Sequence, residues 1–134
     1  MGGEPLTNGK RVLLIEDEPN IIEAVRFILS RDGWHVATHS QGSDAVDAVR
    51  AKAPDLVILD VMLPDRSGYD ILADLRADDA TRALPVMVLT ARGQQKDREA
   101  ALSLGATRFM VKPFANADLL NAVRDMAAGL QTGD

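Results

Sequence analysis

The chain has 134 residues, no cysteine, and a net charge of −5 that arises from 15 basic and 20 acidic residues. Its length fits one domain, and a hydrophobic fraction of 46% with a charged fraction of 26% is ordinary for a globular protein. The absence of cysteine excludes disulfides and thiolate metal sites. No apolar run is long enough to span a membrane, and the absence of a basic cluster argues against direct nucleic-acid binding.

The N-terminal residues 1–9 are polar and contain glycine and proline, so we expect a disordered tail there. They lack the apolar core of a signal peptide, which predicts a cytoplasmic protein with no membrane association.

The first half of the chain alternates between strand and helix patterns. Residues 11–16 (RVLLIE) form a continuous apolar run, which predicts a strand buried on both faces. Pro19 suits the first turn of a helix that Asp32-Gly33 ends. Residues 34–39 (WHVATH) are more polar and alternate in part, as an edge strand does, and a second helix is closed by Pro54.

The second half repeats this alternation. Residues 55–60 (DLVILD) and 84–90 (LPVMVLT) are two further buried runs, separated by a helical pattern. A helix over roughly 94–104 ends at Gly105, a suitable C-terminal cap, and a short last strand over 108–112 precedes a final amphipathic helix. Five successive strand–helix units predict an α/β fold, a three-layer sandwich around a doubly wound parallel sheet.

Four of the predicted strands end in polar residues. In an open parallel sheet, ligands bind beyond the carboxyl ends of the strands. The residues expected at that edge are Glu16, Asp17, Asp60, Thr90 and Lys112. Carboxylates without histidine or cysteine favour Mg²⁺, which commonly shares its coordination with a phosphate.

An aspartate between Mg²⁺ and a lysine is placed for phosphoryl transfer. The Asp60 carboxylate could attack phosphorus in line to give an acyl phosphate, with Lys112 stabilising charge on the transferring oxygens. The Thr90 hydroxyl could donate a hydrogen bond to a phosphoryl oxygen.

The chain resembles the receiver domains of bacterial response regulators, the CheY-like family of two-component signalling. The resemblance spans about residues 10–128 and rests on four motifs in family order, VLLIEDEP, DLVILDVMLPDRSG, PVMVLTA and FMVKPF. It implies a flavodoxin-like fold of five βα units, with the parallel strands in the order 2-1-3-4-5.

The resemblance also implies roles for individual residues. Asp60 would be the phosphoacceptor, and Mg²⁺ would be held by Glu16, Asp17, Asp60 and the backbone carbonyl of Met62. Lys112 would be the family's site lysine, held by a cis bond to Pro113.

Two positions concern the switch that follows phosphorylation. The resemblance implies that Thr90 moves toward the phosphoryl group and that the aromatic residue on the last strand, Phe109, turns inward. Tyrosine is common at this position, and phenylalanine has no hydroxyl to bond. Thr107-Arg108 replaces an acidic pair used across one family dimer face, which argues against that dimer, although Arg98 and Asp118 could still pair. We expect a monomer or a phosphorylation-dependent dimer.

By this resemblance, the phosphoryl donor would be a histidine kinase or a histidine phosphotransfer protein. We expect the receiver domain over residues 10–130 and a C-terminal tail over 131–134, with no output domain. The chain would be a stand-alone receiver or part of a longer protein, and it would catalyse only its own phosphorylation and dephosphorylation.

Other functions remain open from the residues alone. A pseudo-receiver that does not accept phosphate and acts as a protein-interaction module is the main alternative. An aspartyl-phosphate phosphatase would place a second acid where Met62 stands, and a nucleotide binder would want a glycine-rich loop in place of residues 16–19 (EDEP). Taken singly, Thr90 and Phe109 fit strand and core positions, and His35 and His39 fit exposed polar positions.

Overall fold

The computed structural model describes residues 10–132 and shows five strands that alternate with five helices. The elements are β1 (Arg11–Ile15), α1 (Pro19–Arg31), β2 (His35–His39), α2 (Ala45–Lys52), β3 (Leu56–Asp60), α3 (Gly68–Ala77), β4 (Val86–Thr90), α4 (Gln95–Ser103), β5 (Arg108–Val111) and α5 (Asn116–Thr132). All strand pairs are parallel, in the order β2-β1-β3-β4-β5. The predicted α/β class and the strand order implied by the resemblance are therefore confirmed.

The two ends of the chain were predicted to be tails. Residues 1–9 and 133–134 lie outside the described part of the chain, and α5 continues to Thr132, two residues past the expected boundary at 130. Within residues 10–132, no helix is both long and apolar enough to cross a membrane.

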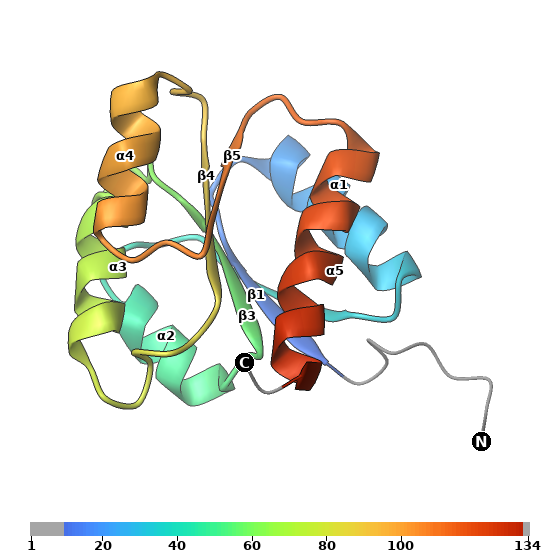
Figure 1. The fold of residues 1–134 in the computed structure, drawn as a ribbon, viewed down its shortest axis with the longest axis horizontal. Helices are drawn as coiled ribbons and strands as arrows, with labels where there is room; N and C mark the ends of the chain where they lie inside the picture. Colours follow the sequence, from blue (N-terminus) through green and yellow to red (C-terminus); the bar gives the residue numbers. More distant parts are fainter. Residues whose placement is uncertain (1–9, 133–134) are drawn as a thin grey trace.

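The sheet forms the middle of three layers, with α1 and α5 against one face and α2, α3 and α4 against the other (Figure 1). Successive residues of a strand point to opposite faces, so each central strand contributes side chains to the core on both sides of the sheet. In β1, Leu13 and Ile15 join the apolar cluster under α2–α4, whereas Val12 and Leu14 join the cluster under α1 and α5. This double burial explains why β1, β3 and β4 read as continuous apolar runs.

The edges of the sheet differ from its centre. All residues of β3 and β4 are buried, whereas β2 has none that is fully buried, which confirms its prediction as an edge strand. Gly33 and Gly105, which follow α1 and α4, have φ values of 95° and 101°. Only glycine adopts this left-handed backbone readily, so both helices end where the sequence predicted.

Candidate functional site

The carboxyl ends of four neighbouring strands place the predicted polar residues at one edge of the sheet. Asp60 and Thr90 are the last residues of β3 and β4, and Glu16 and Lys112 directly follow β1 and β5. The strands are in register there, since Asp60 is paired with Leu89 and Thr90 with Val111. Residues far apart in sequence therefore meet within one small site, as predicted.

Three carboxylates meet at this edge. One oxygen from each of Glu16, Asp17 and Asp60 lies within 4.8 Å of the others. The Glu16 and Asp60 side chains are buried, whereas Asp17 is exposed. The backbone N–H groups of Asp17 and Glu18 both donate to Glu16 Oε2 at 3.2 Å, which fixes the direction of that carboxylate.

The Lys112 ammonium faces two of these acids. Its Nζ atom lies 2.9 Å from Glu16 Oε1 and 3.4 Å from Asp60 Oδ1, and the side chain is 11% exposed. The Lys112 N–H donates to the Thr90 carbonyl at 2.8 Å, and the bond between Lys112 and Pro113 is cis, as the resemblance implied. One ammonium cannot neutralise three carboxylates, so the site retains negative charge when all are ionised.

Burial and this excess of acids change the protonation of the site. Burial raises the pKa of Glu16 to about 7, an increase that Lys112 opposes and the charge of Asp60 supports. For Lys112, burial lowers the pKa, but contacts with Glu16 and Asp60 outweigh it and the net pKa is raised. Lys112 thus stays charged at neutral pH, whereas Glu16 carries a proton in part of the molecules.

The residues at this edge fit a hard divalent cation. The Glu16 Oε1 atom is buried and accepts no well-directed hydrogen bond from residues 10–132, although it pairs in charge with Lys112. Oxygen donors without nitrogen or sulfur are the set that Mg²⁺ prefers. Met62 adjoins the group, since its N–H donates to Asp60 Oδ1 at 3.2 Å. Among the residues described, this is the one cluster of acids and histidines able to hold a metal.

Mg²⁺ affinity should depend on pH. We expect the dissociation constant to rise about tenfold per unit as pH falls below 7, and to level off above pH 8, because the cation must displace one proton from Glu16. Titration calorimetry from pH 5.5 to 8.5 measures this slope. The variant Glu16→Gln should bind more weakly and lose the dependence near pH 7. A flat wild-type profile would show that Glu16 is ionised across this range.

The loop after β3 folds back on the phosphoacceptor candidate. The Gly68 N–H donates to the Val61 carbonyl at 2.9 Å, and a Cβ atom at residue 68 would lie 2.4 Å from the Asp60 carbonyl oxygen and 2.7 Å from the Val61 Cα atom. Backbone atoms cannot give way as a flexible side chain does. Gly68 is therefore required at this position, a role that the motif DLVILDVMLPDRSG contained but that sequence reasoning did not assign.

We expect Gly68→Ala to lower the free energy of unfolding by about 2 kcal/mol or more, because the added methyl group overpacks against backbone. The same displacement should move Asp60 and reduce phosphorylation or Mg²⁺ binding. Chemical denaturation and calorimetry measure the two effects. The matched control is Gly129→Ala, where a Cβ atom meets nothing within 4 Å. Equal stability of the two variants would refute the clash.

A second contact holds the loop after β3 to another loop. The Asp65 carboxylate accepts hydrogen bonds from the N–H groups of Gly42 at 2.8 Å and Ser43 at 2.9 Å, which lowers its pKa. Asp65 thus ties the loop after β2 to the loop after β3. It is a loop residue rather than a fourth ligand, in agreement with its interpretation as a turn residue.

Thr90 and Phe109 lie on the same side of the sheet. Phe109 is paired with Val88, two residues before Thr90, and alternate residues of a strand share a face. The Thr90 side chain is fully buried, and its Oγ1 atom accepts the Arg92 N–H at 3.1 Å. Phe109 is 7% exposed and packs in the cluster under α2–α4. The two residues named for the switch therefore border one region between β4, β5 and α4.

Neither histidine belongs to the acidic cluster, although the His39 carbonyl accepts the Glu16 N–H at 3.0 Å. His35 is exposed, whereas His39 is half-buried with its Nε2 atom 2.7 Å from Asp44 Oδ1, which corrects its expected exposure. The reason is that the loop before α2 covers the end of β2.

Comparison with known proteins places most of the described chain in one family. The model of the "Response regulator receiver domain" family matches residues 12–124. The probable transcriptional regulatory protein TcrX of Mycobacterium tuberculosis is 41% identical over 122 residues, which cover 91% of this chain and 50% of that protein. The chain thus spans about half the length of the curated relatives it matches.

Solved structures agree with the sequence matches. A chemotaxis protein of Vibrio cholerae has a TM-score of 0.81 and 26% identity, covering 87% of this chain and 98% of its own. The receiver domain of a sensor histidine kinase from Pseudomonas aeruginosa has a TM-score of 0.80 and 30% identity, covering 88% of this chain and 97% of its own. The latter structure has a magnesium ion coordinated in its active-site cleft.

Proposed function

Because this chain belongs to the response-regulator receiver family, we propose that it signals by accepting a phosphoryl group on Asp60. The observation that carries the assignment is the meeting of Asp60 with two further acids and the Lys112 ammonium at the carboxyl edge of the sheet. A pseudo-receiver would be expected to lack an acid or the lysine, and this chain has the complete set.

The reaction requires little covalent chemistry from the protein. One oxygen of the Asp60 carboxylate attacks phosphorus in line and forms an O–P bond, while the bond to the donor group breaks and its electron pair leaves with the donor. Lys112 stabilises charge on the transferring oxygens, and the Thr90 hydroxyl donates to one of them. A bound Mg²⁺ would neutralise further charge on the phosphoryl group.

Glu16, Asp17, Asp60 and the Met62 carbonyl are the proposed Mg²⁺ ligands. Support comes from the oxygen-only donor set, the burial of the Glu16 and Asp60 carboxylates beside a single ammonium, and the magnesium ion in the similar Pseudomonas aeruginosa domain. Glu16 and Asp60 also contact Lys112, so the metal and the lysine would both bind oxygens of these two carboxylates, and Asp60 would also carry the phosphoryl group.

The proposed donor is a histidine kinase or a histidine phosphotransfer protein. Relatives include transcriptional regulatory proteins and the receiver domain of a sensor histidine kinase, and these names describe those proteins. For this chain we propose a receiver domain over residues 10–130 that acts in the cytoplasm through protein contacts, as a monomer or a phosphorylation-dependent dimer, without binding nucleic acid itself.

The function is tested by the intact mass of the protein after incubation with acetyl phosphate. We expect one added phosphoryl group when Mg²⁺ is present and none when EDTA removes it. A small donor can fail where a kinase succeeds, so beryllofluoride with Mg²⁺ provides a second test through amide chemical shifts. If neither reagent changes the protein, the pseudo-receiver alternative replaces this proposal.

A further inference from the structure

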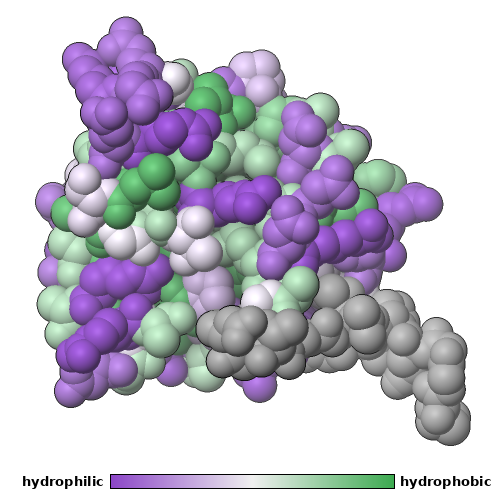
Figure 2. Space-filling view, viewed as in Figure 1, coloured by the Kyte–Doolittle hydropathy of each residue, from purple (hydrophilic) through white to green (hydrophobic). Residues whose placement is uncertain are grey.

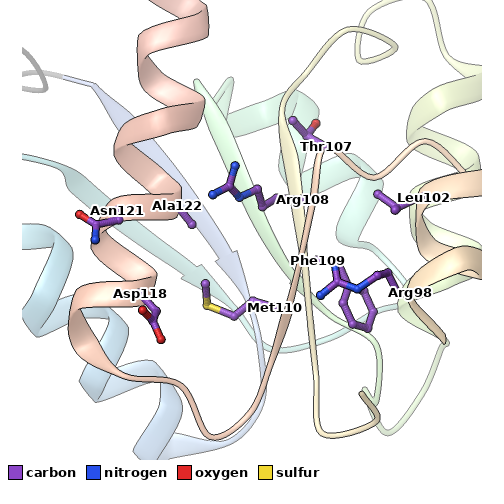
Figure 3. A pocket seen from close by; sticks show the side chains of 9 residues that line it. All are labelled: Arg98, Leu102, Thr107, Arg108, Phe109, Met110, Asp118, Asn121 and Ala122. Atoms are coloured by element: carbon purple, nitrogen blue, oxygen red, sulfur yellow. The ribbon is translucent and has the colours of Figure 1, made fainter. Parts of the chain in front are cut away.

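A hollow of about 500 Å³ lies between α4, β5 and α5, and Phe109 forms part of its wall. Figure 3 shows Arg98 and Leu102 reaching it from α4, and Asp118 and Asn121 from α5. In the space-filling view, hydrophilic and hydrophobic side chains alternate over the visible surface without one continuous apolar patch (Figure 2). The feature that distinguishes this region is a contact between two side chains, Arg98 and Phe109.

The Arg98 guanidinium covers the outer face of the Phe109 ring. Its Cζ atom lies 5.1 Å from the ring centroid, within the range of a cation–π interaction. The ring is 7% exposed and contacts the apolar cluster on its inner side. Phe109 is thus held between the core and a cation from a neighbouring helix (Figure 3).

A second arginine at the same hollow has a different partner. Arg108 Nη2 lies 3.2 Å from Asp125 Oδ2 on α5, and its side chain points away from Phe109 (Figure 3). Arg98 and Arg108 therefore form a natural pair for comparison, because both are exposed cations on the same surface and Arg98 is the one over the ring.

The helix that carries Arg98 makes few buried contacts. Ala101 is its one buried residue, whereas α1 and α3 bury three and four residues. Leu102, which lines the hollow, is 46% exposed. A helix with so few buried contacts depends strongly on each one, so the Arg98–Phe109 contact can link the position of α4 to the position of the ring.

We propose that Arg98 is a positioning residue that holds Phe109 buried through its cation–π contact, and thereby favours the phosphorylated state. The second half of this inference rests on the proposed function, in which the inward aromatic ring accompanies phosphorylation. Phenylalanine cannot be held by a hydrogen bond as tyrosine can, and the guanidinium supplies the missing restraint from outside. Removing the cation frees the ring to leave the core, which weakens the phosphorylated state.

The test is a double-mutant cycle with two readouts. The variants are Arg98→Gln, Phe109→Leu and the combination, with Arg108→Gln as the matched control. The first readout is the ring in the free protein, measured by aromatic NMR as contacts between Phe109 and Val88. The second is the affinity for beryllofluoride with Mg²⁺. We expect Arg98→Gln to reduce the ring contacts and to weaken binding about two- to fivefold, with no change in Arg108→Gln.

The combination decides whether the cation acts through the ring. In the Phe109→Leu background there is no aromatic face, so adding Arg98→Gln should leave beryllofluoride affinity unchanged. An equal loss in both backgrounds, or an equal loss in Arg108→Gln, would overturn the proposal. If wild type binds no beryllofluoride while Arg98→Gln still frees the ring, the proposed function fails and the positioning of Phe109 by Arg98 stands.

Discussion

The variant Asp60→Asn should acquire no phosphoryl group from acetyl phosphate under conditions that modify the wild type fully. An amide oxygen is a much poorer nucleophile than a carboxylate, and no other described acid lies at the end of a strand directly beside Lys112 and Glu16. We expect the loss to be complete within the detection limit of intact-mass measurement, because Asp17 is exposed and Glu16 is fixed by two backbone N–H groups.

The same variant should remain folded. Lys112 keeps its 2.9 Å contact with Glu16, and loss of the Asp60 charge removes one cause of the raised pKa of Glu16. The matched control is Asp65→Asn, which changes a loop carboxylate outside the acidic cluster and should still accept a phosphoryl group, since its amide oxygen keeps one of the two hydrogen bonds from Gly42 and Ser43. Modification of Asp60→Asn at the wild-type rate would place the acceptor elsewhere.

The second large effect is expected for Lys112→Met. Removing the ammonium leaves Glu16 and Asp60 buried without a cation, and breaking a buried ion pair in this way costs about 3–5 kcal/mol of unfolding free energy. Phosphorylation should fall as well, because the ammonium that faces the transferring oxygens is then lost. Urea denaturation with and without Mg²⁺ measures the stability effect, and Mg²⁺ should restore part of it by replacing the lost charge.

The direction in which the stability of Lys112→Met changes with pH follows from the protonation of Glu16. In the variant, the contact that lowers the pKa of Glu16 is gone, so the folded pKa rises further above its ordinary value of 4.5. The folded state then binds more protons than the unfolded state, and stability falls as pH rises from about 4.5 through the folded pKa. Lys112→Met should therefore be more stable at pH 5.5 than at pH 8. Lys96→Met, which changes an exposed lysine, is the control. A pH-independent loss would indicate that Lys112 acts through packing alone.

Most of the fold was readable from the sequence because the strands are buried on both faces. The runs at 11–16, 55–60 and 84–90 are apolar at almost every position, which indicates strands with both faces buried. The more polar run at 34–39 contains the edge strand β2. The exact ends were less predictable. Trp34 belongs to the buried cluster beside α1 and precedes β2 instead of packing along that strand. Its position depends on helices that are remote in sequence.

The composition of the site was predictable for a topological reason. Acids and a lysine that end parallel strands must meet at one edge once the sheet forms, and the structure brings Glu16, Asp17, Asp60 and Lys112 together as expected. Their roles remain proposals. The sequence could not predict features that depend on distances between atoms in the folded chain. Examples are the raised pKa of Glu16 and the close approach of Gly68 to Asp60.

The contact between Arg98 and Phe109 belongs to the same class of missed features. Sequence reasoning considered Arg98 as a partner for Asp118 and considered Phe109 as a switch residue. Eleven positions separate the two along the chain, and no helix or strand periodicity relates them. The contact exists because α4 packs beside β5, which only the three-dimensional arrangement shows (Figure 1).

The central claim is tested most directly by locating the modified residue after phosphorylation. Borohydride reduces an acyl phosphate on aspartate to homoserine and leaves phosphate esters unreduced, so peptide mass spectrometry after reduction identifies the acceptor. We expect homoserine at position 60, only when Mg²⁺ was present. Homoserine at another acid, or a retained phosphate on serine, threonine or histidine, would contradict the assignment of Asp60.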